Sequence, residues 1–315
     1  MITIEPVKGN TFCFVTRFMR IPFYRLNDTE IVLMDSGLAI ERAALEQAFV
    51  HNHLFPRAVL TTHAHYDHIG NHNWLQAQYG TTVYTTLFDA GITQTSLTLQ
   101  ACFYTDRPDV LATAYPYMLL QPDRVLKAQE TSVLIGGVPF CILWLPGHAH
   151  EHTCFVTPDD VAYLGDLLLS KEEFQKMRLP FHQNWGEVLR SIERIRNTHY
   201  SAYILAHNAV FDDIRPVVEY NLNQLGYYAE VVVSLVGEQI DRSELFVRTA
   251  AYFCIDLRSM DRIHIFDRIF QSITTYLEEA GLLECTFTGS QFCYRPVRRT
   301  GTPYLSTAKG ACSAL

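Results

Sequence analysis

The chain has 315 residues, of which 48% are hydrophobic and 18% are charged, a composition that is ordinary for a globular protein and excludes a disordered or collagen-like chain. The net charge of −8 provides no general attraction to anionic lipid or to nucleic acid, so a nucleic-acid partner is not favoured. No apolar run approaches the roughly 18 to 20 residues of a membrane span, and residues 1–10 lack the pattern of a signal peptide, so we expect a cytoplasmic protein with no segment in a membrane.

The N-terminal part predicts an antiparallel sheet followed by alternating helices and strands. Strand-sized apolar pieces separated by turn residues occupy residues 1–7, 11–18, 21–26 and 30–37. Beyond them the apolar spacing predicts a helix over 40–53, a strand over 57–65, a short helix over 71–80 that ends at Gly80, and a strand over 81–86.

The middle of the chain repeats this alternation. Strands are predicted over residues 132–145, 153–157 and 161–169, with Gly136 and Gly137 suited to a hairpin turn. An amphipathic helix over 186–199 then leads into a strand over 202–207. We therefore expect an α/β fold in which two halves pack as layers with the helices outside.

The character of the sequence changes after His207. Helices are predicted over residues 213–238, 243–254 and 263–283, and two short strand-like runs follow around Gly289. Helices that end in a small hairpin indicate a winged-helix-like module. The expected domains are therefore residues 1–210, residues 211–298 and a loosely held tail, 299–315.

The densest chemical signal is the run TTHAHYDHIG, residues 61–70. His63 and His65 lie two positions apart, so at the end of a strand they point to the same side. Asp67 and His68 lie in the following turn and can reach a neighbouring point, which predicts ligands for two adjacent cations. Imidazole with carboxylate suits zinc first, with iron or manganese as alternatives. The alternative is an exposed histidine-rich loop.

Further ligand types follow or interrupt later apolar runs. His148 comes after the run ending at Leu145, Asp166 lies inside the run 161–169, and His207 ends the run 202–207. Polar side chains at such positions can meet at one edge of a layered sheet structure.

The motif His63-x-His65-x-Asp67-His68, followed in order by His148, Asp166 and His207, resembles that of the metallo-beta-lactamase fold hydrolases over residues 1 to about 210. The resemblance implies an αββα sandwich with a small helical, winged-helix-like C-terminal domain. It also implies that one metal takes His63, His65 and His148, that a second takes Asp67, His68 and His207, and that Asp166 bridges both. The sequence departs from the family beside His207, where Ala206 and Asn208 replace glycines.

The activity implied is that of a dinuclear metal-dependent hydrolase acting on an ester, thioester, lactone or phosphodiester. Two divalent ions would generate a bridging hydroxide at neutral pH. Asp166 would help to orient that hydroxide, and Asp67 would accept a hydrogen bond from it or assist proton transfer. The expected partner is a small-molecule substrate, and a homodimer is an open alternative to a monomer.

The same candidate ligands also allow other functions. A persulfide dioxygenase of this fold binds one iron through a subset of them. An endoribonuclease would need a basic channel, and the tight basic cluster that we find is Arg295, Arg298 and Arg299. A non-catalytic DNA-binding protein built on the winged module is a further alternative, which the acidic charge disfavours.

Several residues outside the ligand set have two interpretations. Asp35 either orients a metal ligand by a hydrogen bond or caps the turn into the next helix. The insertions 96–120 and 171–185 fall where they can overhang the metals, so we expect Tyr104, Tyr115, Tyr117 and Phe181 to form a substrate lid or pocket, the alternative being core packing. Among the other histidines we expect a supporting role for His152 and a surface or helix-end position for His72. For His182 we expect core or surface packing, the alternative being a place in the wall of a pocket.

Overall fold

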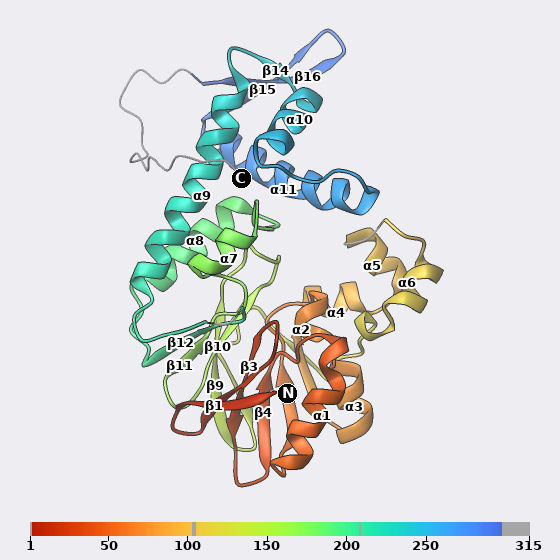
Figure 1. Ribbon diagram of the computed structural model, residues 1–315, viewed down its shortest axis with the longest axis vertical. Coiled ribbons are helices and arrows are strands. Elements are labelled where there is room, and N and C mark those ends of the chain that lie inside the picture. Colours follow the sequence, from red (N-terminus) through yellow and green to blue (C-terminus); the bar gives the residue numbers. More distant parts are fainter. Residues whose placement is uncertain (1, 103–104, 208, 298–315) are drawn as a thin grey trace.

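The computed structural model describes residues 2–102, 105–207 and 209–297. Two β-sheets stack face to face with helices on both outer sides, and a helical C-terminal part with a small sheet extends from one end (Figure 1). The predicted αββα sandwich with a helical C-terminal part is therefore present. Among the described residues, no helix combines the length and apolar character that crossing a membrane would require.

The first sheet has seven strands in chain order. Its first four strands form the predicted antiparallel meander, and its last three add in parallel. The strands are β1 (Thr3–Lys8), β2 (Thr11–Val15), β3 (Arg20–Arg25), β4 (Glu30–Met34), β5 (Phe55–Leu60), β6 (Thr82–Thr86) and β7 (Arg124–Leu126).

The second sheet has six strands in the order β13-β12-β11-β10-β9-β8. Its neighbours are antiparallel except for the β11–β12 pair. The β8–β9 turn uses Gly136 and Gly137 at positive φ, 61° and 83°, as the sequence predicts. The strands are β8 (Ser132–Ile135), β9 (Val138–Trp144), β10 (Thr153–Val156), β11 (Val161–Tyr163), β12 (Ala202–Leu205) and β13 (Ala209–Phe211).

Both faces of the central strands β11 and β12 are covered, which explains why these two strands are continuously apolar. In β12, Ala202 and Ile204 face the core between the two sheets, whereas Tyr203 and Leu205 face the helices on the outer side. Alternate side chains of a strand point to opposite faces, so a strand covered on both sides has no polar position.

The helices of the sandwich lie on its two outer sides (Figure 1). α1 and α3 lie beside the first sheet, and α8 and α9 lie beside the second. Short helices occupy the two insertions, for which the sequence predicted no element. The bounds are α1 (Arg42–His51), α2 (Tyr66–Ile69), α3 (His72–Tyr79), α4 (Leu87–Thr93), α5 (Ser96–Cys102), α6 (Pro108–Ala114), α7 (Lys171–Lys176), α8 (Trp185–Arg196) and the 3₁₀ turns η1 (Ala39–Glu41) and η2 (Pro116–Met118).

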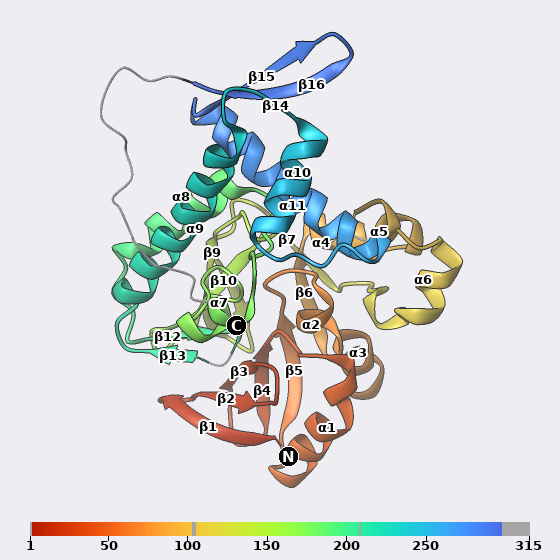
Figure 2. The same cartoon turned by 45° about the horizontal axis from the view of Figure 1, so that its top comes forward.

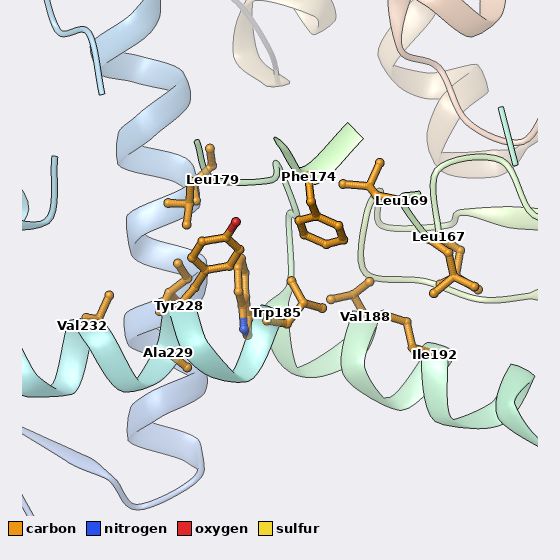
Figure 3. Close-up of a cluster of buried hydrophobic side chains, with 14 of the residues drawn as sticks. Leu167, Leu169, Phe174, Leu179, Trp185, Val188, Ile192, Tyr228, Ala229 and Val232 are labelled. Carbon is orange, nitrogen blue, oxygen red and sulfur yellow. The ribbon is translucent and has the colours of Figure 1, made fainter. Parts of the chain in front are cut away.

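α8 connects the sandwich to the C-terminal part. Its Asn184 cap accepts a hydrogen bond from the Glu187 amide, which satisfies a free N–H group of the first turn. Trp185, Val188 and Ile192 recur at helical spacing on one buried face. Figure 3 shows this face packed against Tyr228 and its neighbours on α9.

The C-terminal part contains the predicted helices and hairpin, and in addition a two-residue strand that the sequence did not predict. The strand β14 pairs with β16, so the small sheet has the order β14-β16-β15. The elements are α9 (Arg215–Val236), β14 (Ile240–Asp241), α10 (Arg242–Tyr252), α11 (Met260–Glu279), β15 (Leu283–Thr288) and β16 (Gln291–Pro296). The domain boundaries at residues 210 and 298 stay predictions, and the predicted tail lies outside the described residues.

Two features show how the C-terminal part packs on the sandwich. Its helices share one continuous apolar core with α8 and with the outer face of the second sheet. The N-terminal end of α11 lies beside α5 in both views (Figures 1 and 2), and Thr105 Oγ1 donates a hydrogen bond of 2.6 Å to the Asp261 carboxylate there. The insertion 96–120 and α11 therefore meet above the same edge of the sheets.

Candidate metal centre

The segment that carries the first four candidate ligands begins where β5 ends: His63 and His65 lie in a loop, and Asp67 and His68 lie in the short helix α2 that follows it. The predicted strand through His65 is wrong at this end, because β5 ends at Leu60. Beyond Leu60, two backbone N–H groups donate to side chains instead of to a neighbouring strand. Thr62 N donates to Asp35 Oδ1 at 2.7 Å, and Ala64 N donates to Asp89 Oδ1 at 3.3 Å. Two buried carboxylates therefore shape the loop in place of a strand ladder.

Three imidazole nitrogens converge as the resemblance implies. His65 Nδ1 lies 2.9 Å from His63 Nε2 and 3.0 Å from His148 Nε2. Burial lowers the pKa of His63 and of His148 well below the ordinary value, and it lowers the pKa of His65 to about 4. All three rings are therefore neutral near pH 7, which is the form in which imidazole binds a metal.

The second group brings together Asp67, His68, Asp166 and His207. Asp166 Oδ1 lies 3.3 Å from His68 Nε2 and 3.4 Å from His207 Nε2. Asp67 Oδ2 lies 3.9 Å from His68 Nε2 and 3.7 Å from His207 Nε2. His207 keeps its position despite the non-glycine residues around it, and its Nδ1 lies 3.3 Å from the carbonyl oxygen of Phe18, its hydrogen-bond partner.

Asp166 lies between the two groups. Its Oδ1 faces His68 and His207, while its Oδ2 lies 3.5 Å from His148 Nε2. One carboxylate therefore offers an oxygen to each group, which is the arrangement expected of a bridging ligand.

Two buried atoms in the second group indicate that a cation fits there. His68 Nε2 and Asp166 Oδ1 are both buried, and neither has a hydrogen-bond partner among the described residues. Burying polar atoms without partners is costly, and a cation would satisfy both. The donor set of imidazoles and carboxylates suits a divalent metal such as zinc.

The charges of the second group lead to the same conclusion. Burial opposes the charged form of His68, but Asp166, Asp35 and Asp67 outweigh it and raise the pKa of His68 well above the ordinary value. Asp166 likewise raises the pKa of His207 to about 9. The carboxylates therefore create a strongly negative potential where positive charge is favoured, either as protons on imidazole or as a metal ion.

Asp35 supports the second group rather than capping a helix. It is fully buried, and its Oδ2 accepts hydrogen bonds of 2.7 Å from His68 Nδ1, Thr62 Oγ1 and Tyr163 Oη. No side-chain cap from Asp35 is present at either η1 or α1. The first interpretation of Asp35 is therefore confirmed, and the bond at Nδ1 leaves His68 Nε2 free to bind a metal.

His152 has the predicted supporting role. It is fully buried, and its Nε2 accepts a hydrogen bond of 3.3 Å from the backbone N–H of Asp166. The residue before Asp166 must be glycine, because Gly165 has φ 51° and a Cβ atom there would lie 2.8 Å from His152 Nε2. His152 and Gly165 together fix the position of Asp166.

A cavity of about 510 Å³ opens onto both groups. It is lined by His65, Asp67, His148, Asp166 and His207 from the two groups and by Tyr66, His182 and Arg268. Its other walls are apolar: Ala64, Met118, Leu169, Met177, Leu179, Pro180, Phe181, Ile265 and Ile269.

The predictions for the insertions and the other histidines have mixed outcomes. Phe181 and His182 line the cavity, so the pocket interpretation of His182 is confirmed. Tyr115 and Tyr117 pack beside the cavity wall in a small apolar cluster that contains Met118. His72 is the first residue of α3, so its predicted helix-end position is confirmed. It is not a surface residue, because it is fully buried between Ser36 Oγ at 2.7 Å and Thr61 Oγ1 at 2.8 Å. Tyr104 lies outside the described residues.

The α11 residues that line the cavity were not predicted from the sequence. Ile265, Arg268 and Ile269 line the cavity from the C-terminal part. The amphipathic spacing of α11 predicts a buried face but does not indicate which surface that face meets.

Comparison with known proteins places this geometry in a family. The model of the metallo-beta-lactamase superfamily matches residues 23–207, which include all seven candidate ligands. No curated protein matches the chain.

Solved structures share the fold at low sequence identity. A metallo-beta-lactamase family protein from Thermus thermophilus has 18% identity and a TM-score of 0.64, covering 94% of this chain and 98% of that one. A beta-lactamase domain protein from Burkholderia ambifaria has 18% identity and a TM-score of 0.66, covering 93% and 94%. A beta-lactamase from Chitinophaga pinensis has 16% identity and a TM-score of 0.54, covering 71% and 91%. The family model, which spans more than half of the chain, shows that the protein belongs to the metallo-beta-lactamase superfamily.

Proposed function

We propose that the protein is a dinuclear metal-dependent hydrolase that acts on a small-molecule ester, thioester or lactone. The observation that carries this proposal is the pair of adjacent ligand groups with Asp166 facing both. His63, His65 and His148 would hold one divalent ion, and Asp67, His68 and His207 the other. Zinc is the first choice, with iron or manganese as alternatives. When bound, such a pair of ions activates a water molecule and polarises the bond to be cleaved.

The residues around the ligands have separate tasks in this mechanism. Asp166 is held by His152 and offers one oxygen to each group, so it sets the spacing of the site. Asp67 lines the cavity, and its carboxylate is placed to accept a proton from water and return it to the leaving group. Asp35 keeps His68 in the orientation that presents Nε2.

The volume and the lining residues of the cavity support a small-molecule substrate. Its volume of about 510 Å³ falls in the range typical of small-molecule sites, about 300 to 1,000 Å³. Among the described residues that line the cavity, Arg268 is the one lysine or arginine, whereas an RNA-binding channel needs several. Ester, thioester and lactone substrates are therefore favoured over a polynucleotide.

The C-terminal part supports a role as a wall of the site. Its order of helix, strand, two helices and hairpin supports our proposal of a winged-helix-like module. In such modules the helix before the hairpin reads DNA. Here that helix, α11, faces the cavity with Ile265 and Ile269, so we assign it to substrate binding.

Metal analysis combined with hydrolysis assays tests the proposal. The purified protein is expected to contain two divalent ions per chain, to hydrolyse at least one of a panel of p-nitrophenyl esters, thioesters and lactones, and to lose this activity with a chelator. His148→Ala is expected to abolish hydrolysis and reduce metal content, whereas the exposed His199→Ala serves as the matched control. One iron per chain with persulfide oxidation would support the dioxygenase instead, and full activity in the chelated protein would contradict any metal mechanism.

A further inference from the structure

Arg268 is an isolated charge at a junction between two cavities. It lines the cavity of about 510 Å³ that contains the candidate ligands, and it also lines a second cavity of about 200 Å³. Its side chain forms no ion pair or hydrogen bond within the part of the chain that the structure describes. Its half-buried guanidinium therefore has donors directed to space that a ligand can fill.

The second cavity is polar, and no carboxylate is among its described lining residues. Besides Arg268 it is lined by side chains that can form hydrogen bonds: His150, Gln183, Asn184, Gln271, Ser272 and Thr275. A guanidinium surrounded by hydrogen-bonding groups, without a carboxylate to pair with it, is suited to a single anionic group.

The first cavity is apolar between the candidate ligands and Arg268. Met177, Leu179, Phe181, Ile265 and Ile269 contribute to its walls. A substrate that spans from the ligand groups to the second cavity must therefore carry its reactive group and its charge at opposite ends of an apolar segment.

We propose that Arg268 binds a carboxylate or phosphate at the far end of an apolar acyl chain, so that the substrate is an ester, thioester or lactone with an anionic tail. This inference rests on the proposed hydrolase function. It assigns substrate recognition to α11, an element outside the residues that the family model matches.

Two esters with acyl chains of equal length test the recognition of charge. p-Nitrophenyl hexanoate ends in a methyl group, and mono-p-nitrophenyl adipate ends in a carboxylate. The metal-loaded protein is expected to favour the adipate ester by about tenfold or more in kcat/KM, the range of a hydrogen bond to a charged group. Arg268→Gln is expected to bring this ratio close to one, and Arg268→Lys to give an intermediate ratio, because lysine keeps the charge without the planar fork.

Arg262→Gln is the matched control. Arg262 lies on the same helix, outside the cavities, and pairs with Asp256, so its variant is expected to keep the wild-type ratio. Thermal melting of all three variants verifies folding. The proposal would be overturned if Arg268→Gln had the same ratio of kcat/KM for the adipate and hexanoate esters as the wild type. It would also be overturned if the wild type preferred the hexanoate ester.

A binding measurement separates this inference from the proposed function. Calorimetry of the chelated protein with hexyl phosphate, hexanoate and hexanol is expected to show tighter binding of at least one anion, and Arg268→Gln is expected to remove that advantage. The stronger of the two anions identifies the tail as phosphate or carboxylate. If neither ester is hydrolysed, the ester form of the proposed function fails, whereas equal anion binding by wild type and Arg268→Gln rejects the role of Arg268.

Discussion

At the residue scale, the second metal group depends on a side chain that does not belong to it. Asp35 accepts hydrogen bonds from His68, Thr62 and Tyr163 and has no exposed surface. It holds the imidazole of His68 in one tautomer, with Nδ1 protonated and Nε2 directed to Asp166.

Asp35→Asn is expected to weaken the second metal selectively. Asparagine removes the negative charge, and its NH2 group must face a donor, because both oxygens of Asp35 accept hydrogen bonds. The affinity of the second group for its ion should therefore fall about 10- to 100-fold, while the three-histidine group keeps its ion. Zinc titration against a competing chelator measures both affinities. Tyr163→Phe, which removes one donor and keeps the carboxylate, should change them less. Two unchanged affinities in Asp35→Asn would show that Asp35 does not orient His68.

Asp89 is expected to make the stability of the chelated protein depend on pH. Burial raises its pKa from 3.8 to about 7, so the folded state binds its proton more tightly than the unfolded state does. The resulting contribution, on the order of 4 kcal/mol, is full below about pH 4 and is lost as the pH rises through about 7. Urea unfolding of the wild type and of Asp89→Asn at pH 5 and pH 8 measures this contribution to the free energy of unfolding. The asparagine does not titrate, so its variant lacks the contribution. The prediction fails if both proteins have the same pH dependence.

At the scale of elements, the candidate ligands lie just beyond the ends of strands, on loops and, for Asp67 and His68, on the short helix α2. β11 ends at Tyr163 and Gly165 turns the chain so that Asp166 faces both groups. β12 likewise ends at Leu205, before His207. The loops are positioned because both strands are buried on both faces and cannot shift without breaking two cores.

Gly165→Ala is expected to reduce both stability and metal content. Its Cβ atom would lie 2.8 Å from His152 Nε2 and 3.1 Å from Thr62 Cβ, at a φ of 51°. The strain should cost about 1 to 3 kcal/mol and displace Asp166. Gly91→Ala in α4 is the control, because open space surrounds it and alanine favours a helix by up to about 1 kcal/mol. Chemical unfolding and metal analysis compare the two, and a Gly165→Ala protein with full metal content would contradict this assignment.

At the scale of the whole molecule, the sandwich and the C-terminal helices are joined through one core. Trp185 N donates a hydrogen bond of 2.9 Å to Ser272 Oγ, and the apolar cluster continues from β12 through α8 and α9 to α11. The candidate metal centre on the sandwich and the proposed substrate contact on α11 are thereby joined through one continuous core.

Phe270→Ala is expected to destabilise the entire protein. Phe270 is fully buried against Phe246 and Phe266, and truncation of such a ring costs about 3 to 5 kcal/mol. Unfolding followed by circular dichroism and by tryptophan fluorescence should remain one coincident transition at lower urea. Phe287→Ala, on an exposed side chain of β15, should change stability by less than about 0.5 kcal/mol. Separate loss of the C-terminal helices would show that the two parts unfold independently.

The sequence by itself determined the helices after His207, the meander of β1 to β4, the hairpin at Gly136 and Gly137, and the ligand motif. These features depend on interactions between residues close in the chain, where apolar period, turn residues and ligand spacing can be read directly. The order of the seven ligands also carried the family resemblance.

Only the tertiary structure decided where β5 ends, why His72 is buried, and which surface α11 faces. Thr62 leaves the strand because Asp35 accepts its N–H, and His72 is satisfied by Ser36 and Thr61 from two other segments. Arg268 reaches the cavity because α11 packs on α8 through the shared core. Such contacts join residues distant in sequence, and no local periodicity encodes their partners.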